Sequence, residues 1–255
     1  MNLKEVFNKG QNYPENFFYG DMLEVIRLYE LQEGLFLLGK TSEETELLWG
    51  VNEIKDLKKA IKKIKMENED VNFIFRYAGE LDEVMEKKEI IKQWGYKEKD
   101  LYVGYFCDLY TLPVDLTCTS IEYLSLNNID NFLLLEREIF NTFNISRQEL
   151  INWLDSEEYI ILIYKEEDII KGFVVMNLYG DNRQSCFVRS LGVCERERKK
   201  GIGKKLILSG LREAKKRGAL KSMLWVDLNN IIARNLYEEI GYMIDRKEAE
   251  IIFRT

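Results

Sequence analysis

Residues 185–203 constrain the fold of this chain most, because they join a strand pattern, a glycine turn and a helix start. The apolar run SCFVRSLGV (185–193) predicts a strand, and residues 201–218 have the pattern of a helix ending on a glycine. Between them lies Arg198-Lys199-Lys200-Gly201-Ile202-Gly203. Glycines let a ligand approach the backbone, and a helix start presents unpaired N–H groups at its positive end. The segment predicts a pyrophosphate site, with a solvated basic helix start as the alternative.

Two common phosphate-binding motifs do not fit this segment. The GK[ST] ending of a Walker loop is missing, and the full G-x-G-x-x-G of a dinucleotide-binding fold is absent.

The rest of the second half predicts mixed strands and helices. Strands are expected at 121–126, 220–228 and 245–255, and a hairpin over 158–180 turning at residues 166–168. Helices are expected at 128–143, 146–155 and 230–241. Ser146, with Glu149 three residues later, has the pattern of a capping box.

The first half has a similar order of elements. Strand-like runs occur near 28–39, 44–51, 71–79 and 100–110, and helical patterns at 53–68 and 80–94. Pro113 lies in a polar stretch at 110–119, where we place a domain boundary.

Local matches between the halves indicate a structural duplication. Trp94-Gly95-Tyr96 and Ile240-Gly241-Tyr242 both follow a helix and precede a turn and a strand. Leu48-Trp49-Gly50-Val51 and Leu191-Gly192-Val193 both precede a basic helix. Chance similarity is the alternative, since such short matches recur in chains that mix strands and helices.

Composition excludes several classes of function. The chain has no histidine, which excludes Ser-His-Asp and Cys-His catalysis and histidine-ligated metals. The net charge of −7 argues against general nucleic-acid binding. Four scattered cysteines without a C-x-x-C pair fit a reducing cytoplasm and no zinc site, and we expect no metal. No apolar run approaches a membrane span or a signal peptide, so a cytoplasmic protein is expected.

Two motifs in the second half together resemble the GCN5-related N-acetyltransferases (GNAT). Residues 198–203 match the R/Q-x-x-G-x-G/A motif that follows a strand in this family. Residues 230–242 match N-x-x-A-x-x-x-Y-x-x-x-G-F/Y on a later helix, with one helix and one strand between the motifs. The resemblance covers residues 119–255.

The resemblance implies an α+β fold with a mixed, mostly antiparallel twisted sheet flanked by helices, in two tandem copies. It implies domains at 1–112 and 119–255, the second being an N-acetyltransferase that moves the acetyl group of acetyl-CoA to a primary amine of a small molecule or peptide. A monomer or homodimer is expected. The alternative is a non-catalytic acyl-CoA-binding regulatory module.

The resemblance also implies roles for individual residues. Tyr237 would face the sulfur and assist the leaving thiolate, and Asn230 would contact the CoA arm or cap its helix. The acetyl-CoA-binding residues would be Leu191, Gly192, Val193, Arg198, Lys199, Lys200, Gly201, Ile202, Gly203, Lys204, Asn230 and Tyr237.

The first half resembles a degenerate copy that binds no CoA. Its helix at 53–68 has no glycine near its start, and Ile91 stands where the second half has Tyr237.

A general base is harder to assign. Family members often carry a Glu or His on the strand before the CoA loop, but here that strand offers Phe187 and Arg189. Asp227, Glu157, Glu158 or a chain of water molecules are the candidate replacements. Arg189 would bind an acidic group of the acceptor or form a surface ion pair.

Overall fold

The computed structural model describes residues 2–42, 44–111, 120–140 and 145–255. Residues 112–119 of the predicted boundary at 110–119, which include Pro113 and Cys118, lie outside these residues. The chain divides into two compact units. The N-terminal unit contains residues 1–103, 227–229 and 246–255, and the C-terminal unit contains residues 104–226 and 230–245.

The N-terminal unit is built on the sheet order β2-β3-β4-β5-β12-β6, with β1 paired to β4. The pairs β1–β4, β2–β3, β3–β4 and β5–β12 are antiparallel, and β4 and β5 are parallel. The elements are α1 (Leu3–Gln11), β1 (Glu15–Phe17), β2 (Glu24–Leu31), β3 (Gly34–Lys40), β4 (Thr45–Val51), α2 (Ile54–Glu67), β5 (Ile74–Gly79), α3 (Leu81–Lys92), β6 (Lys97–Asp108) and, from the end of the chain, β12 (Met243–Arg254).

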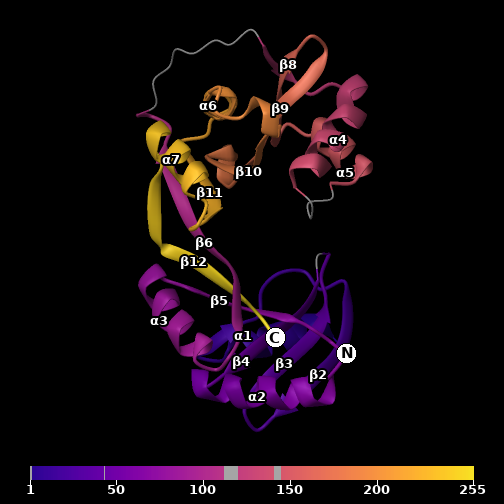
Figure 1. The fold of residues 1–255 in the computed structure, drawn as a ribbon, viewed down its shortest axis with the longest axis vertical. Coiled ribbons are helices and arrows are strands. Elements are labelled where there is room, and N and C mark those ends of the chain that lie inside the picture. Colours follow the sequence, from indigo (N-terminus) through magenta and orange to yellow (C-terminus); the bar gives the residue numbers. More distant parts are fainter. Residues whose placement is uncertain (1, 43, 112–119, 141–144) are drawn as a thin grey trace. The chain divides into compact units, whose positions relative to one another are not determined.

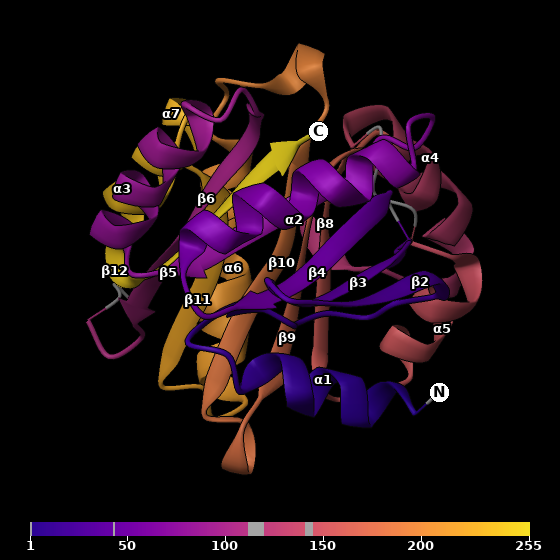
Figure 2. The same ribbon diagram turned by 90° about the horizontal axis from the view of Figure 1, so that it is seen from below.

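Helices α1 and α2 pack on opposite faces of β3 and β4 (Figure 2). Helix α2 follows the predicted pattern: Leu57, Ala60, Ile61 and Ile64 are buried. The run predicted as one strand near 28–39 is a hairpin of β2 and β3. Helix α1 was not predicted, since it exposes most of its residues and buries only Val6 and Gly10.

The C-terminal unit is built on the order β6-β11-β10-β9-β8-β7. Strands β7 to β10 are antiparallel neighbours, and β10 and β11 are parallel. The elements are β7 (Ile121–Tyr123), α4 (Ile129–Ile139), α5 (Arg147–Leu154), β8 (Tyr159–Glu166), β9 (Ile169–Tyr179), β10 (Ser185–Val193), α6 (Ile202–Lys216), β11 (Lys221–Asp227) and α7 (Ile231–Ile240).

Helix α6 packs on one face of β8, β9 and β10, and α4 and α5 pack on the other (Figure 1). The α4 side forms an apolar cluster in which Ile129, Phe132 and Leu150 meet Phe173 and Val175 of β9. The capping box is confirmed: Ser146 and Glu149 exchange both hydrogen bonds at the start of α5.

Strands β6 and β12 each contribute residues to both units. In the N-terminal unit, β12 pairs with β5 from Ala249 to Arg254. In the C-terminal unit, β6 is the neighbour of β11. Each compact unit therefore includes a strand from the other half of the sequence, and the division into domains at 1–112 and 119–255 stays a prediction. The predicted α+β class with a mixed sheet is confirmed.

Candidate active site

The site begins where β10 and β11 diverge. Their parallel pairing covers only Ser185–Phe187 of β10, whereas the pairing of β10 with β9 continues to Val193. A bulge between Val188 and Ser190 shifts the register at this point. Beyond Phe187, no strand of the described chain pairs with the far edge of β10, so this edge presents free backbone groups.

The backbone groups of Leu191 and Val193 face this open edge. The N–H of Cys194 bonds to the carbonyl of Lys171 on β9, and successive residues of a strand point their N–H groups to opposite sides. The backbone N–H groups of Leu191 and Val193 therefore point away from β9. The Val193 carbonyl accepts a hydrogen bond from Nε of Arg198 at 3.2 Å, which agrees with this direction.

The start of α6 presents uncapped N–H groups. Gly201 is its N-cap residue, in the left-handed region at φ 77°, and makes no side-chain cap. A Cβ at Gly201 would meet nothing within 4 Å, so the approach to the helix start is open there. Lys199 also has a positive φ of 63°, which turns the loop into the helix. The N–H groups of Ile202, Gly203 and Lys204 thus have the orientation that favours an anion.

Gly203 brings α6 close to β10 and α7. A Cβ there would meet Leu236 of α7 at 3.4 Å, Val193 at 3.8 Å and Leu191 at 4.0 Å. The helix start, the open strand edge and α7 therefore converge within a few ångströms. A long narrow ligand can lie along β10 while its anionic part sits at the start of α6.

The basic side chains of this loop are partly engaged by carboxylates. Lys200 pairs with Glu197 at 2.8 Å, and Lys204 pairs with Glu239 at 2.7 Å. Nε of Arg198 donates a hydrogen bond to the Val193 carbonyl, and this bond holds the loop against the strand. The predicted role of these cations in binding stays a prediction, but the loop that carries them has a defined shape.

Tyr237 on α7 is buried, with 8% of its surface exposed. Its ring meets that of Tyr242 edge to face at 5.6 Å. Burial raises the pKa of its phenol to about 12, so the hydroxyl keeps its proton at neutral pH. No described residue forms a hydrogen bond with this hydroxyl. It is a donor available to a ligand.

Asn230 caps α7, as its side chain accepts from the N–H of Ala233 at 3.1 Å. This is one of the two roles left open by the sequence. The amide nitrogen of Asn230 is not used by that cap, so a contact with CoA stays a prediction.

The three carboxylates considered as bases differ in surroundings. Glu157 is 81% exposed and pairs with Arg183. Glu158 is also exposed. Asp227 accepts from the N–H of Asn229 and belongs to the N-terminal unit. Arg189 is exposed and stacks over the ring of Trp153, 5.1 Å from its centroid. Arg189 thus has a cation–π partner, a contact that neither prediction for it included.

Comparison with known proteins identifies the fold that carries this site. Residues 129–242 match the acetyltransferase (GNAT) family. We call this matched region the GNAT domain. Both sequence motifs lie within this GNAT domain, and it contains the divergent strands and the start of α6.

Curated relatives and solved structures agree with this assignment. A mycothiol acetyltransferase of Kocuria rhizophila is 24% identical over 116 residues, which are 44% of this chain and 38% of the relative. One from Corynebacterium glutamicum strain R is 23% identical over 145 residues, 57% of this chain and 48% of the relative. This chain thus matches less than half the length of these relatives.

A solved GCN5-related N-acetyltransferase from Sphaerobacter thermophilus has the same fold, with a TM-score of 0.64 and 13% identity. The likeness covers 88% of this chain and 76% of that one, so it extends beyond the GNAT domain into the first half. Among the described residues, no helix is long and apolar enough to span a bilayer.

In the N-terminal unit, a strand edge beside a short parallel pairing is covered by another segment of the chain. Strands β4 and β5 are also parallel and pair only at Glu46 and Ile74. Strand β1 pairs with the end of β4, where Phe17 lies opposite Trp49. A Cβ at Gly50 would meet the Gly10 carbonyl at 2.8 Å. The segment 10–17 therefore covers this edge of β4, whereas the edge of β10 in the GNAT domain is open.

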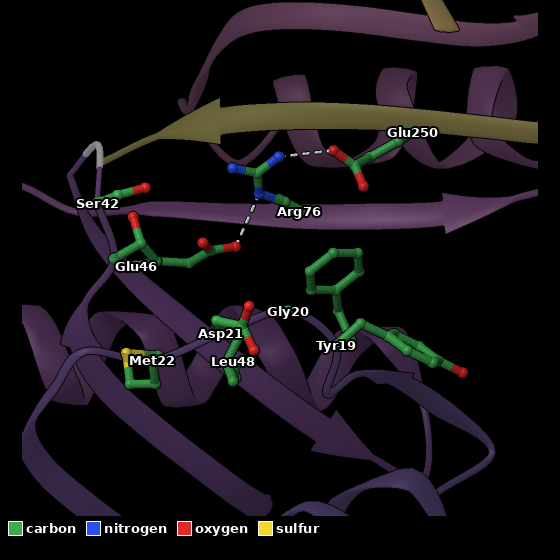
Figure 3. A pocket seen from close by; sticks show the side chains of 11 residues that line it. Tyr19, Gly20, Asp21, Met22, Ser42, Glu46, Leu48, Arg76 and Glu250 are labelled. Atoms are coloured by element: carbon green, nitrogen blue, oxygen red, sulfur yellow. Dashed lines mark hydrogen bonds and ion pairs between the residues drawn. The ribbon is translucent and has the colours of Figure 1, made fainter. Parts of the chain in front are cut away.

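The N-terminal unit has a separate cavity of about 370 Å³ (Figure 3). Arg76 lies on its wall between two carboxylates, with Nε 2.8 Å from Glu46 and an Nη 2.7 Å from Glu250. Asp21 and Tyr19 also line the space. Burial raises the pKa of Glu46, although the Arg76 guanidinium opposes this shift. Because both carboxylates engage the guanidinium, Arg76 holds this wall together rather than offering a free cation.

Proposed function

We propose that this protein transfers the acetyl group of acetyl-CoA to a primary amine of a small molecule or peptide. The observation that carries the proposal is the convergence, within the GNAT domain, of the open edge of β10 with the uncapped start of α6. The mycothiol acetyltransferase relatives support an acyltransferase activity.

The residues present fit acetyl-CoA, which supplies an activated acetyl thioester when bound. The backbone N–H groups of Lys199–Lys204 hold the pyrophosphate, with Gly201 leaving room for its oxygens. The backbone of Leu191 and Val193 bonds the extended arm in the manner of an added strand. Gly203 has no side chain to fill the space between α6, Leu236 of α7 and Val193 of β10, the groups that a Cβ there would contact.

Tyr237 stabilises the leaving sulfur by donating a hydrogen bond. A phenol with a pKa of about 12 is a much weaker acid than a thiol. Complete transfer of its proton to a thiolate is therefore strongly uphill. A hydrogen bond that strengthens as negative charge develops on sulfur is the contribution that the buried hydroxyl can make.

We propose one CoA site per chain. The segment 10–17 occupies the equivalent strand edge in the N-terminal unit, which supports the reading of the first half as a degenerate copy.

The test is thiol release from acetyl-CoA in the presence of spermidine, glucosamine or a lysine-containing peptide, with the acetylated product identified by mass spectrometry. Release that depends on the amine supports the transferase. The alternative, a regulatory module that binds acyl-CoA without turnover, predicts stoichiometric binding by calorimetry and no amine-dependent release. Two CoA molecules bound per chain would contradict the degenerate first half.

A further inference from the structure

Arg189 is an exposed arginine on β10 whose guanidinium has no anionic partner among the described residues. It forms no ion pair or hydrogen bond with them, and it lies over the ring of Trp153, 5.1 Å from the centroid. The carboxylate of Glu149 is bonded to Ser146, which is the main cause of its lowered pKa, and the charge of Arg189 adds to this shift without an ion pair. Within the described chain, the guanidinium therefore stays available to an external anion.

An aromatic pair holds this guanidinium in place. Trp153, near the end of α5, stacks on Tyr159 at the start of β8, with 4.9 Å between the ring centroids and 7° between the ring planes. Both rings are half-buried and pack against the apolar cluster under α4 and α5. A guanidinium that contacts an aromatic ring through its flat face keeps its in-plane N–H donors for another partner.

Arg189 lies where β10 leaves β11 and the proposed acyl slot begins. The pairing with β11 ends at Phe187, and Arg189 occupies the bulge that shifts the register between β10 and β9. Leu191, whose backbone lines the slot, follows two residues later. At about 3.3 Å per residue, the Cα atoms of Arg189 and Leu191 lie roughly 6–7 Å apart. The guanidinium is thus within reach of a small acceptor whose nitrogen attacks a thioester in the slot.

The side chain of Arg189 lies on the α5 face of the sheet. It reaches Trp153 of α5, whereas Leu191 turns its side chain toward α6, where a Cβ at Gly203 would lie 4.0 Å from it. The proposed pyrophosphate site is also at the start of α6. Bound acetyl-CoA would therefore occupy the α6 side and the edge of β10, and the acceptor would approach from the α5 side, where Arg189 stands.

We propose that Arg189 binds a carboxylate of the acceptor, so that the preferred substrates are primary amines that carry a carboxylate a few carbon atoms from the nitrogen. This inference rests on the proposed acetyl transfer and names the substrate class of the same site. The planar fork of a guanidinium matches a carboxylate through two parallel hydrogen bonds. Because Trp153 holds the fork in place, less freedom is lost when the carboxylate binds.

The surrounding charges favour a carboxylate over a phosphate. Two other arginines of this region are already engaged. Arg183 pairs with Glu157 at 2.8 Å, and Arg217 pairs with Glu213 at 3.0 Å and donates to two backbone carbonyls. The single available guanidinium matches the charge of one carboxylate, whereas a phosphate monoester carries close to two negative charges at neutral pH.

The experiment compares amines that differ in the acidic group alone. Glycine, β-alanine and γ-aminobutyrate are tested against ethylamine, propylamine and butylamine of matched length, and phosphoethanolamine supplies the phosphate. For each amine, kcat/KM of thiol release is measured with the wild-type protein, Arg189→Met and Arg189→Lys. The matched control is Arg147→Met, which makes the same change at an arginine of α5 that pairs with Asp130.

The wild-type protein should prefer the best carboxylate over its matched alkylamine. Arg189→Met should lower kcat/KM for that carboxylate by about 10–10²-fold, the scale of losing hydrogen bonds to a charged group. The loss should fall on KM, because the contact is equally strong before and during the reaction. Arg189→Lys, which keeps the charge without the fork, should restore part of it. Alkylamine turnover and acetyl-CoA affinity should stay unchanged, and Arg147→Met should behave as wild type.

An Arg189→Met deficit of equal size for carboxylates and alkylamines would show an indirect effect and overturn the inference. Wild-type kcat/KM for every carboxylate in that variant, or release only with amines that lack a carboxylate, would overturn it while leaving the transfer intact. A preference for phosphoethanolamine that Arg189→Met abolishes would overturn the carboxylate assignment in favour of a phosphate. If the wild-type protein binds acetyl-CoA but releases no thiol with any amine, both the transfer and this inference are wrong.

Discussion

Tyr237→Phe tests whether the Tyr237 hydroxyl contributes to turnover without contributing to the stability of the fold. The phenol has no hydrogen-bond partner among the described residues, and the ring that packs on Tyr242 is kept. The free energy of unfolding in urea should therefore change by less than about 0.5 kcal/mol, as expected where no native hydrogen bond is lost. Acetyl-CoA affinity should be preserved for the same reason.

The effect on turnover should be much larger. With the pKa of Tyr237 at about 12 and that of a thiol at about 8.5, full proton transfer to sulfur is uphill by about 5 kcal/mol. The hydroxyl can act only by hydrogen bonding, and losing one such donor lowers kcat by about 10–10³-fold. Single-turnover rates of thiol release measure this directly. Unchanged single-turnover chemistry would refute the role, and a loss of stability above about 1.5 kcal/mol would show that the hydroxyl bonds to protein instead.

Four further outcomes are expected. Gly203→Leu overfills the slot beside α7 and should abolish the rise in melting temperature that acetyl-CoA gives, at a cost of about 1–3 kcal/mol in urea stability. Arg76→Met leaves Glu46, which is 4% exposed, without its cation, and should destabilise the fold by about 3–5 kcal/mol in urea, less at acidic pH where that carboxyl is neutral. Deletion of residues 246–255 removes the partner of β5 and should abolish cooperative thermal unfolding of the N-terminal unit. Because burial raises the pKa of Glu136 from 4.5 to about 7, wild-type stability should fall by up to about 3 kcal/mol as pH rises through that window, and urea titrations of Glu136→Gln should lack that slope.

The sequence predicted the GNAT domain well because its signals are local. Helix α6 begins within one residue of the expected position, since Gly201 both ends the loop and starts the helix. The hairpin of β8 and β9 turns at Glu167 and Asp168, both with positive φ, where the charged run had predicted it. Short-range backbone chemistry fixes these features, so a pattern of ten residues is enough to find them.

The buried carboxyl group of Glu136 could not be found in the same way. Glu136 belongs to a helix whose other inward positions are apolar, and the charged residue at that position is unremarkable in a list of carboxylates. Its significance comes from total burial without a hydrogen-bond partner, which depends on packing. The one signal available was a glutamate on the apolar stripe of Phe132 and Phe140, which breaks the helical pattern.

The division of the chain depends on strand order, which no local pattern reveals. Strand β6 ends the first half of the sequence and β12 ends the second, and each follows a helix and a Gly-aromatic turn. Strand β12 nevertheless pairs with β5 of the first half, and β6 is the neighbour of β11 of the second, so each unit includes a strand from the other half of the sequence. Strand β1 pairs with β4 and so occupies backbone hydrogen-bonding groups at the edge of that strand. The edge of β10 in the GNAT domain has no such partner beyond Phe187. This segment supports the proposal that CoA binds in the GNAT domain and not in the first half.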